Sequence, residues 1–442
     1  MDGDDSIPTF NLKAVIRETG LKPDTLRAWE RRYGLPEPNR SSGGHRLYSQ
    51  RDIRVLKWLI ARQNEGMSIS RAVELWRRHE ADGKDPLQMP EYATPDGVHT
   101  PLAFAGGESL AELREAWIGA CLSFDEPKAE HVLAQAFAVY PPEVVCFEVL
   151  QRGLSTIGDG WYQDEITVQQ EHFASGLAIR RLETLIAATP APTRPGRILI
   201  GSPPDEGHIF SPLLLTLLLR RLGYDVVYLG ANVPAQRLEH TVTTARPNFV
   251  VMPVQQLHTA ASLLDVIEAL RPMSVPVAFG GLVFNRIPEL AERIPGYFLG
   301  QRIDRAVQSI EQLLQSPLRV PAAPPLPPGY HEALTGYLKA QIKIEARTWD
   351  LMLQSGISPD NLAVANLNIG RNIIAALRLG NVNFLGPDIY WMRELLTNFG
   401  VPAHLTGVYL RAYHDAAAAY LGHQGDLLVR WLDEAASMGA GT

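Results

Sequence analysis

Five short β-rich runs alternate with helical segments between residues 197 and 315. The runs read RILIGS, DVVYLG, FVVMPV, PVAFGG and YFLG, and amphipathic helices lie between them. A strand followed by a helix and another strand forms a right-handed βαβ unit, which places its strands parallel in one sheet. The alternation therefore predicts an α/β domain built on a parallel sheet.

Three stretches rich in proline, glycine and small residues divide the 442-residue chain. They are residues 80–107, 189–196 and 316–329, and their composition is typical of linkers. The segments that they separate are 1–80, 108–188, 197–315 and 330–442. Apolar spacing of three and four residues predicts helices in 108–188 and in 330–442, in the latter at about 335–355, 359–380, 387–399, 403–422 and 424–437. The predicted fold class is multidomain α and α/β.

Charge is distributed unevenly along the chain. Residues 1–80 hold 15 Lys and Arg against 11 Asp and Glu, whereas the whole chain has a net charge of -7. A basic end on an acidic body is typical of a nucleic-acid-binding module joined to something else. Only Cys121 and Cys146 are present, which excludes a disulfide framework and a four-cysteine metal site. With no apolar N-terminal stretch and no long apolar run, we expect a cytoplasmic protein without a membrane segment.

The basic N-terminal segment predicts a DNA reader. Residues 10–18 predict a short helix, Pro23 and Asp24 open a second one with the sequence TLRAWERRYG, and a glycine-containing hairpin follows. Guanidinium groups on the second helix suit guanine edges or phosphates, and the hairpin would form a wing that grips the backbone. The residues expected to contact DNA are Arg27, Arg31, Arg32, Tyr33, Arg40, His45, Arg46 and Tyr48.

This segment resembles the MerR family of winged-helix transcription factors. The resemblance covers about residues 8–78 and rests on helix, wing and spacing together, in the pattern TLRAWERRYG-L-x-P-x-R-x-x-x-G-x-R-x-Y. It implies a winged helix-turn-helix that binds double-stranded operator DNA. Readers of this family act as dimers on paired half-sites, so the resemblance also implies self-association, as a dimer or tetramer.

Two further constellations point to a metal-binding cofactor. Trp161 is followed ten residues later by Glu171 and His172 on a predicted helix. Glu206-x-His208 follows the first predicted strand of 197–315, at the carboxyl end where open parallel sheets bind ligands. A neutral imidazole is a good ligand for cobalt, and a carboxylate on its other nitrogen orients the ring. Glu206 or Asp205 is expected to supply that carboxylate.

Residues 108–315 resemble the cobalamin-binding modules of CarH-type photoreceptors and methionine synthase. The resemblance implies a helical cap over 108–188 and a Rossmann-like cobalamin domain over 197–315. It gives His208 the role of lower cobalt ligand. It assigns Trp161, Glu171 and His172 to the cap, which covers the other face of the corrin. Gly280 and Gly281 correspond to the glycine turn beneath the nucleotide tail of the cofactor, where a missing side chain permits close approach.

Three positions depart from the family pattern. Ser211 stands where the motif D/E-x-H-x-x-G has its glycine. Pro253 to Gln256 replace a serine or threonine after the third strand, so Gln255 or Gln256 is expected to contact the nucleotide tail. Tyr162 follows the cap tryptophan, where CarH-type sensors carry the histidine that becomes the second cobalt ligand after photolysis. His172 or water is the expected substitute.

The C-terminal segment, 330–442, is predicted to form an all-α bundle with several aromatic and histidine residues. It resembles the bilin-binding extension of photocobilins, which implies a second chromophore. The segment contains no cysteine, so a bilin such as biliverdin would be bound non-covalently. The alternative is a bundle that serves dimerisation or signalling.

Together these features predict a cobalamin-dependent, light-responsive transcriptional regulator rather than an enzyme. The expected cofactor is adenosylcobalamin, and the resemblance implies repression in the dark and release in light. Two alternatives stay open. One is a regulator that senses cobalamin or a bilin without light, and the other is a corrinoid-dependent enzyme or methyl carrier.

Overall fold

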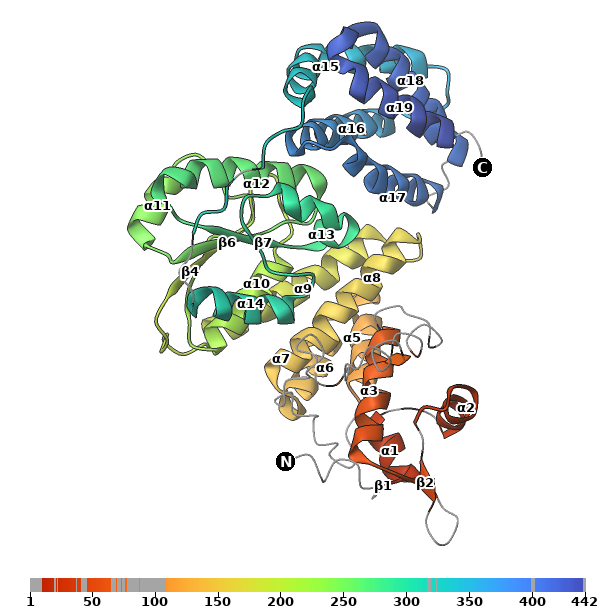
Figure 1. Ribbon diagram of the computed structural model, residues 1–442, viewed down its shortest axis with the longest axis vertical. Helices are drawn as coiled ribbons and strands as arrows, with labels where there is room; N and C mark the ends of the chain where they lie inside the picture. The colour runs from red at the N-terminus through yellow and green to blue at the C-terminus, as the bar shows by residue number, and fades with distance from the viewer. Residues whose placement is uncertain are drawn as a thin grey trace. The chain divides into compact units, whose positions relative to one another are not determined.

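The computed structural model describes most of the chain as two compact units, Met1–Phe104 and Ala105–Thr442 (Figure 1). The described residues are 10–19, 21, 23–36, 38–40, 46–64, 69, 73, 76–77, 87, 109–315, 319–322, 324–398 and 402–439.

The first unit is a small winged-helix domain. Its elements are β1 (Phe10–Asn11), α1 (Leu12–Thr19), α2 (Pro23–Tyr33), β2 (Asn39–Arg40), β3 (Arg46–Tyr48) and α3 (Gln50–Asn64). The Asn11 side chain caps α1 by accepting a hydrogen bond from the amide of Ala14 at 2.9 Å. The strands form an antiparallel sheet in the order β1-β3-β2. Leu26 and Trp29 of α2 are buried in the core with Leu56 of α3, so α2 is held by its apolar side.

The second unit begins with a helical cap. The cap consists of α5 (Leu110–Leu122), α6 (Glu126–Val139), α7 (Pro142–Val145), a π-helical turn at Cys146–Gln151, α8 (Arg152–Tyr162) and α9 (Val168–Ala187). Capping boxes at Ser109 and Thr167 begin α5 and α9. Cys121 and Cys146 are buried in the cap, and burial raises the pKa of each thiol to about 12.

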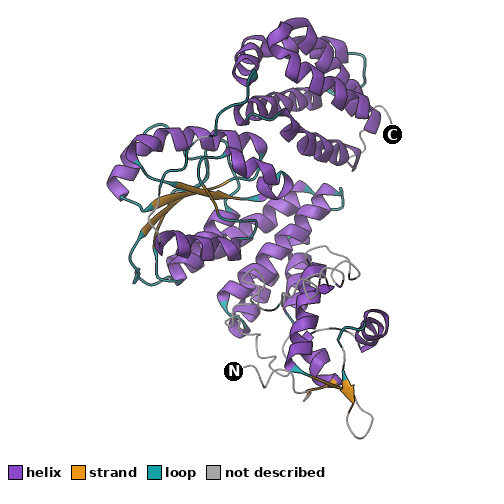
Figure 2. Ribbon diagram, in the orientation of Figure 1, coloured by secondary structure: helices purple, strands orange, loops and turns teal. Residues whose placement is uncertain are grey.

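A five-stranded parallel sheet follows (Figure 2). Its elements are β4 (Arg197–Ile200), α10 (Phe210–Arg221), β5 (Asp225–Tyr228), α11 (Leu238–Ala245), β6 (Phe249–Pro253), α12 (Leu257–Leu270), β7 (Val277–Gly280), α13 (Leu282–Arg286), β8 (Tyr297–Phe298) and α14 (Ile303–Gln315). Side chains alternate along β4: Ile198 and Ile200 face α10 and α14, and Leu199 faces α11 and α12. The strand order is β5-β4-β6-β7-β8, so the topology reverses between β4 and β6. In such sheets the ligand site lies at the carboxyl ends of those two strands.

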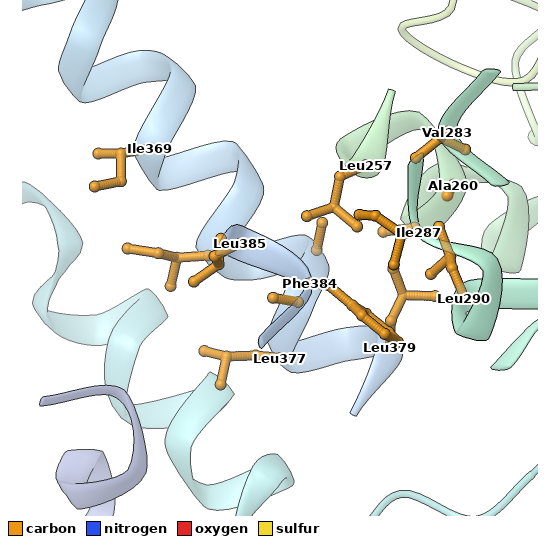
Figure 3. Packing of buried hydrophobic residues seen from close by; sticks show 14 of the residues in the cluster. Leu257, Ala260, Val283, Ile287, Leu290, Ile369, Leu377, Leu379, Phe384 and Leu385 are labelled. Carbon is orange, nitrogen blue, oxygen red and sulfur yellow. The ribbon is translucent and has the colours of Figure 1, made fainter. Parts of the chain in front are cut away.

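The C-terminal bundle consists of α15 (Tyr330–Met352), α16 (Pro359–Leu379), α17 (Leu385–Asn398), α18 (Ala403–Leu421) and α19 (Asp426–Gly439). The bundle and the sheet domain share one hydrophobic cluster. Figure 3 shows Leu379 and Phe384 of the bundle beside Ile287 and Leu290 of the sheet domain. Arg378 of α16 also pairs with Asp265 of α12, with a closest approach of 2.5 Å. The predicted fold class is confirmed, and the helix ends in this segment differ from the prediction by at most five residues.

Candidate functional site

The carboxylate of Glu206 joins the loops that follow β4 and β6. It is 1% exposed and accepts hydrogen bonds on both oxygens. Oε1 receives the backbone amide of His208 at 3.0 Å and lies 2.5 Å from its ring Nδ1. Oε2 receives the amide of Gln255 and the hydroxyl of Thr259, each at 2.8 Å. One buried carboxylate therefore holds together the sheet edge at the topological switch point.

This arrangement leaves the other ring nitrogen of His208 for a ligand. Since the carboxylate accepts at Nδ1, that nitrogen carries the proton and Nε2 presents a lone pair. The hydrogen bond to Glu206 is the main cause that raises the pKa of His208. Burial alone would raise the pKa of Glu206, but its bonds to His208 and Gln255 hold it below the ordinary value. The pair has the form of an oriented metal-binding imidazole, with Glu206 rather than Asp205 as its partner.

His208 faces a large cleft of about 1250 Å³. The cleft lies between α8 of the cap, the carboxyl edge of the sheet and the C-terminal bundle. Trp161 lines it from the cap, and Gln255, Gln256 and His258 line it from the sheet edge. Pockets for drug-sized ligands span roughly 300–1,000 Å³, so this cleft suits a larger cofactor. Within the described residues, no group of three or more His, Cys, Asp or Glu is placed to hold a metal ion. Two imidazoles, those of His208 and His258, line the cleft, and the ring of His208 is oriented by Glu206.

The glycine turn after β7 requires the residue that it has. Gly281 has φ of 125°, and a Cβ there would collide with the carbonyl of Val254. Gln255 accepts a hydrogen bond from the amide of Leu282 at 3.0 Å, which ties the loops after β6 and β7 together. Gly280 precedes the turn at the end of β7. Gln255 thus supports the turn in addition to lining the cleft.

The two predicted cap residues on α9 lie outside the set that lines the cleft. His172 has a side chain that is 75% exposed, and its Nδ1 lies 2.8 Å from Glu171. Glu171 also accepts a hydrogen bond from Ser175 at 2.5 Å. The role of His172 as an upper cobalt ligand stays a prediction, and it requires a movement of this ring from the arrangement seen here.

Tyr162 contacts the C-terminal bundle. Its ring stacks on Trp391 with centroids 5.6 Å apart, and its hydroxyl donates to the carbonyl of Trp391 at 3.3 Å. Asn398 donates to the carbonyl of Tyr162 at 2.8 Å. The guanidinium of Arg286, on α13, lies 5.2 Å from the Trp391 ring centroid. Trp391 therefore meets both the cap and the sheet domain. The sequence interpretation missed this junction.

Replacing Trp391 with alanine is expected to loosen the bundle from the cap. The change removes an aromatic stack and a cation–π contact, worth about 0.5–1.5 and 0.5–1 kcal/mol. Amide hydrogen exchange should rise at the end of α8 and along α17. Tyr420→Ala, which removes a ring of α18 that is 46% exposed, is the control and should leave α8 unchanged. Equal protection of α8 in wild type and Trp391→Ala would show that the stack does not hold the bundle.

The winged helix presents an exposed basic helix. Arg27 and Arg31 of α2 are exposed. Between them Glu30 accepts from Arg46 Nε at 2.9 Å and from the Tyr48 hydroxyl at 2.5 Å, which ties β3 to α2. Tyr48 is fully buried, and burial raises the pKa of its hydroxyl, so we correct its expected place among the DNA-contacting side chains.

The structure describes only some of the other side chains that are predicted to contact DNA. Tyr33 is half-buried, and its carbonyl accepts from Arg77 at 2.5 Å. Arg32 and Arg40 belong to α2 and β2, but their side chains lie outside the described residues, as does all of His45.

Replacing Arg31 with alanine is expected to weaken DNA binding by roughly 10-fold. An exposed guanidinium on such a helix serves either a phosphate or a base edge. If Arg31 contacts a phosphate, the salt dependence of binding should fall by about one unit of slope; if it reads a base, selectivity at one position should relax. Fluorescence anisotropy over a salt series measures both. Arg180→Ala, which removes an exposed arginine paired with Glu126 on the cap, should bind like wild type.

Comparisons with known proteins agree with this geometry. The model described as MerR HTH family regulatory protein matches residues 10–78, and two models described as B12 binding domain match residues 113–186 and 196–302. The fold and the site therefore define a DNA reader joined to a cobalamin-binding module. These three ranges end before the C-terminal bundle.

Two relatives from Myxococcus xanthus are similar to this chain over most of their own length. The HTH-type transcriptional repressor CarH is 31% identical over 294 residues, which cover 65% of this chain and 93% of CarH. The HTH-type transcriptional repressor CarA is 31% identical over 280 residues, 62% of this chain and 87% of CarA. The chain belongs to the CarH and CarA family of MerR-type transcriptional regulators with a cobalamin-binding module. The predicted resemblance to this family is confirmed.

Among solved structures, the monomethylamine corrinoid protein of Methanosarcina barkeri is 17% identical with a TM-score of 0.41, over 46% of this chain and all of that one. In the part of the chain that the structure describes, no helix has the length and apolarity needed to span a membrane.

Proposed function

We propose that this cobalamin-binding regulator responds to light and uses adenosylcobalamin to control its affinity for double-stranded operator DNA. The observation that carries the proposal is the Glu206–His208 pair, which points a lone pair into a cleft large enough for the cofactor. We propose DNA binding in the dark and release in light from the resemblance to CarH-type sensors, and the relatives CarH and CarA are both transcriptional repressors. We infer that the chain acts by binding rather than catalysis, because its cofactor module is joined to a DNA reader.

Each residue at the cleft has a separate role in this proposal. Glu206 holds the proton of His208 at Nδ1 and so keeps Nε2 available to cobalt. Trp161, at the end of α8, covers the cleft from the cap side. Gly281 lets the loop after β7 pass against the Val254 carbonyl, and the turn formed in this way is proposed to lie beneath the tail of the cofactor. When bound, adenosylcobalamin supplies a cobalt–carbon bond that light breaks.

We propose that a light-induced change of the cofactor in the cleft moves the cap. Trp391 touches both Tyr162 of the cap and Arg286 of the sheet domain, so a displacement of one against the other changes this junction. Paired half-sites require paired readers, and we propose a homo-oligomer, a dimer or tetramer, whose interface this displacement alters.

The bundle is also proposed to hold a second, non-covalent cofactor, a bilin such as biliverdin. The support is the cleft itself, which continues past the corrinoid residues into the wall formed by α16, α17 and α18.

Tyr162 supports a second candidate function, a sensor that acts without light. Its ring is engaged with Trp391, and at this position the likeness to CarH-type sensors implies a histidine that ligates cobalt after photolysis. In this candidate, cobalamin or a bilin changes DNA affinity equally in darkness and in light.

Absorption spectra before and after illumination separate the two. We expect the full chain loaded with adenosylcobalamin to change its spectrum under green or blue light, and to change its elution volume on size exclusion. The hydroxocobalamin form is the control and should show neither change. A stable adenosylcobalamin complex with no light-induced change would reject the photoreceptor and leave the light-independent sensor.

A further inference from the structure

Helix α15 of the C-terminal bundle leaves an apolar stripe uncovered. Leu338, Ile342 and Leu353 are 52%, 82% and 68% exposed, and Ile342 is the most exposed large apolar side chain that the structure describes. Ala346 is exposed and Trp349 is half-buried. At about 100° per residue, these five side chains fall within about 80° of the helix surface and so form one stripe. Single exposed apolar residues are ordinary, but a continuous stripe is typical of an interaction surface.

Helix α16 widens this stripe into a face. Asn366 of α16 donates to the carbonyl of Glu345 at 3.4 Å. One turn later, Gly370 lies against Gln341, so α16 packs antiparallel beside α15. Leu367, the residue after Asn366, is 51% exposed and extends the apolar surface. The structure describes all of α15, and none of its residues lines the cleft, so this outer face is separate from the cofactor site.

The stripe on α15 is complementary to a second copy of itself. Its midpoint lies just before Ala346. When a second copy is turned end for end about this point, Leu338 comes opposite Leu353 of the copy. In the same way Ile342 comes opposite Trp349, and the small side chain of Ala346 lies at the centre of the contact. A two-fold contact uses the same patch on both copies and requires this kind of self-complementarity.

The charges beside the stripe match in the same arrangement. Lys339 and Asp350 are exposed on one edge of the stripe, and neither has an ion-pair partner among the described residues. They are eleven residues, or about three turns, apart, so the end-for-end arrangement places Lys339 of each copy near Asp350 of the other. Glu345, the acid nearest the two-fold axis, is turned toward α16, where Gln341 donates to it at 2.8 Å. The charges therefore favour a second copy as the occupant of this face.

The face has the area that a stable dimer needs. Helix α15 has 23 residues, which makes it about 35 Å long at 1.5 Å per residue. Two adjacent helices are about 20 Å wide, so α15 and α16 together offer about 700 Å². Specific interfaces bury roughly 800 Å² on each partner.

We propose that the outer face of α15 and α16 binds the same face of a second copy of this chain, with the two α15 helices antiparallel about a two-fold axis. The three matched ranges end before the bundle, so this surface is additional to the modules that they cover. The assignment rests on the proposed homo-oligomer and names one of its surfaces. Because the face is separate from the cleft, this dimer forms without cobalamin and in darkness.

Sedimentation velocity of the full chain without cobalamin, in darkness and over a range of protein concentrations, tests the face. Wild type should form a dimer. Ile342→Glu should weaken dimerisation by at least about 30-fold, because it places a charge in the apolar stripe of both copies. Arg347→Glu is the matched control, since Arg347 is exposed about 140° around α15 from Ile342, and it should dimerise like wild type. Equal affinity of Ile342→Glu and wild type for hydroxocobalamin checks that the variant is folded.

An exchange of charges tests the two-fold pairing itself. Lys339→Asp and Asp350→Lys should each weaken dimerisation by roughly 10-fold, because each change brings like charges together twice in one dimer. An equal mixture of the two variants should dimerise as tightly as wild type, since every pair in the mixed dimer is again opposite in charge. A mixture that dimerises no more tightly than either variant alone would overturn the antiparallel arrangement.

The outcomes separate this surface from the proposed function. A wild-type dimer that Ile342→Glu leaves intact would overturn the assignment alone. A wild type that is monomeric without cobalamin and oligomeric with it would also overturn the assignment, and the proposed homo-oligomer would then use another surface. A wild type that is monomeric in both conditions would overturn both. None of these outcomes bears on cobalamin binding at His208, which has its own test.

Discussion

Replacing His208 with alanine is expected to weaken cobalamin binding on the order of 100-fold and to abolish the light response. Partners that merely orient a metal-bound histidine are worth roughly 10- to 100-fold in affinity, so the ligand itself is worth at least the upper part of that range. The absorption spectrum of any cobalamin that still binds should differ from wild type, because the lower axial ligand is gone. Equilibrium titration and absorption spectroscopy of the full chain measure both effects.

His172→Ala is the matched control. Its side chain is 75% exposed and lies outside the cleft, so dark binding and the dark spectrum should equal those of wild type. A difference confined to the illuminated spectrum would identify His172 as the upper ligand. If His208→Ala keeps the wild-type spectrum and affinity, then the imidazole does not ligate cobalt.

Replacing Glu206 with alanine is expected to lower the free energy of unfolding of the second unit by about 3 kcal/mol. The change leaves the amide of Gln255 and the hydroxyl of Thr259 without their acceptor, and an unmet buried donor costs about 1–3 kcal/mol. It also frees the ring of His208, so cobalamin affinity should fall by roughly 10- to 100-fold in protein that remains folded. Chemical denaturation followed by tryptophan fluorescence measures the stability.

Two further variants separate stability from ligand orientation. Glu206→Gln keeps the size of the side chain and one acceptor oxygen, so it should lose less stability than Glu206→Ala. Glu239→Ala removes an exposed acid of α11 and should change stability by less than about 0.5 kcal/mol. Wild-type stability in Glu206→Ala would mean that the two loops are held by other contacts.

The sheet and the Glu206–His208 pair were predictable because the signals are local. β-rich runs and helices alternate in 197–315, and Glu206 lies in the loop after the first strand, which ends at Ile200. Glu206 and His208 are two residues apart in one loop, so their contact needs no pairing of distant segments, although Gln255 and Thr259 also hold the carboxylate. The sequence does not distinguish Asp205 from Glu206 as the partner of His208, because one residue of register decides which carboxylate points inward.

Contacts between distant segments were not predictable in this way. Tyr162 and Trp391 are 229 residues apart, and the sequence of neither predicts that they stack. Tyr48 illustrates a different limit. Alternation along β3 places Arg46 and Tyr48 on one face, but only packing against Glu30 shows that this face is turned inward.

The affinity of the adenosylcobalamin-loaded chain for its operator, measured in darkness and after illumination, tests the coupling between cofactor and DNA most directly. The operator can be obtained by selection from random double-stranded DNA. Coupling between sites amounts to roughly 5- to 150-fold, and we expect wild type to bind at least about 10-fold more tightly in the dark, with no such difference in His208→Ala. Equal wild-type affinity in both conditions, or a light effect that persists without His208, would contradict the account.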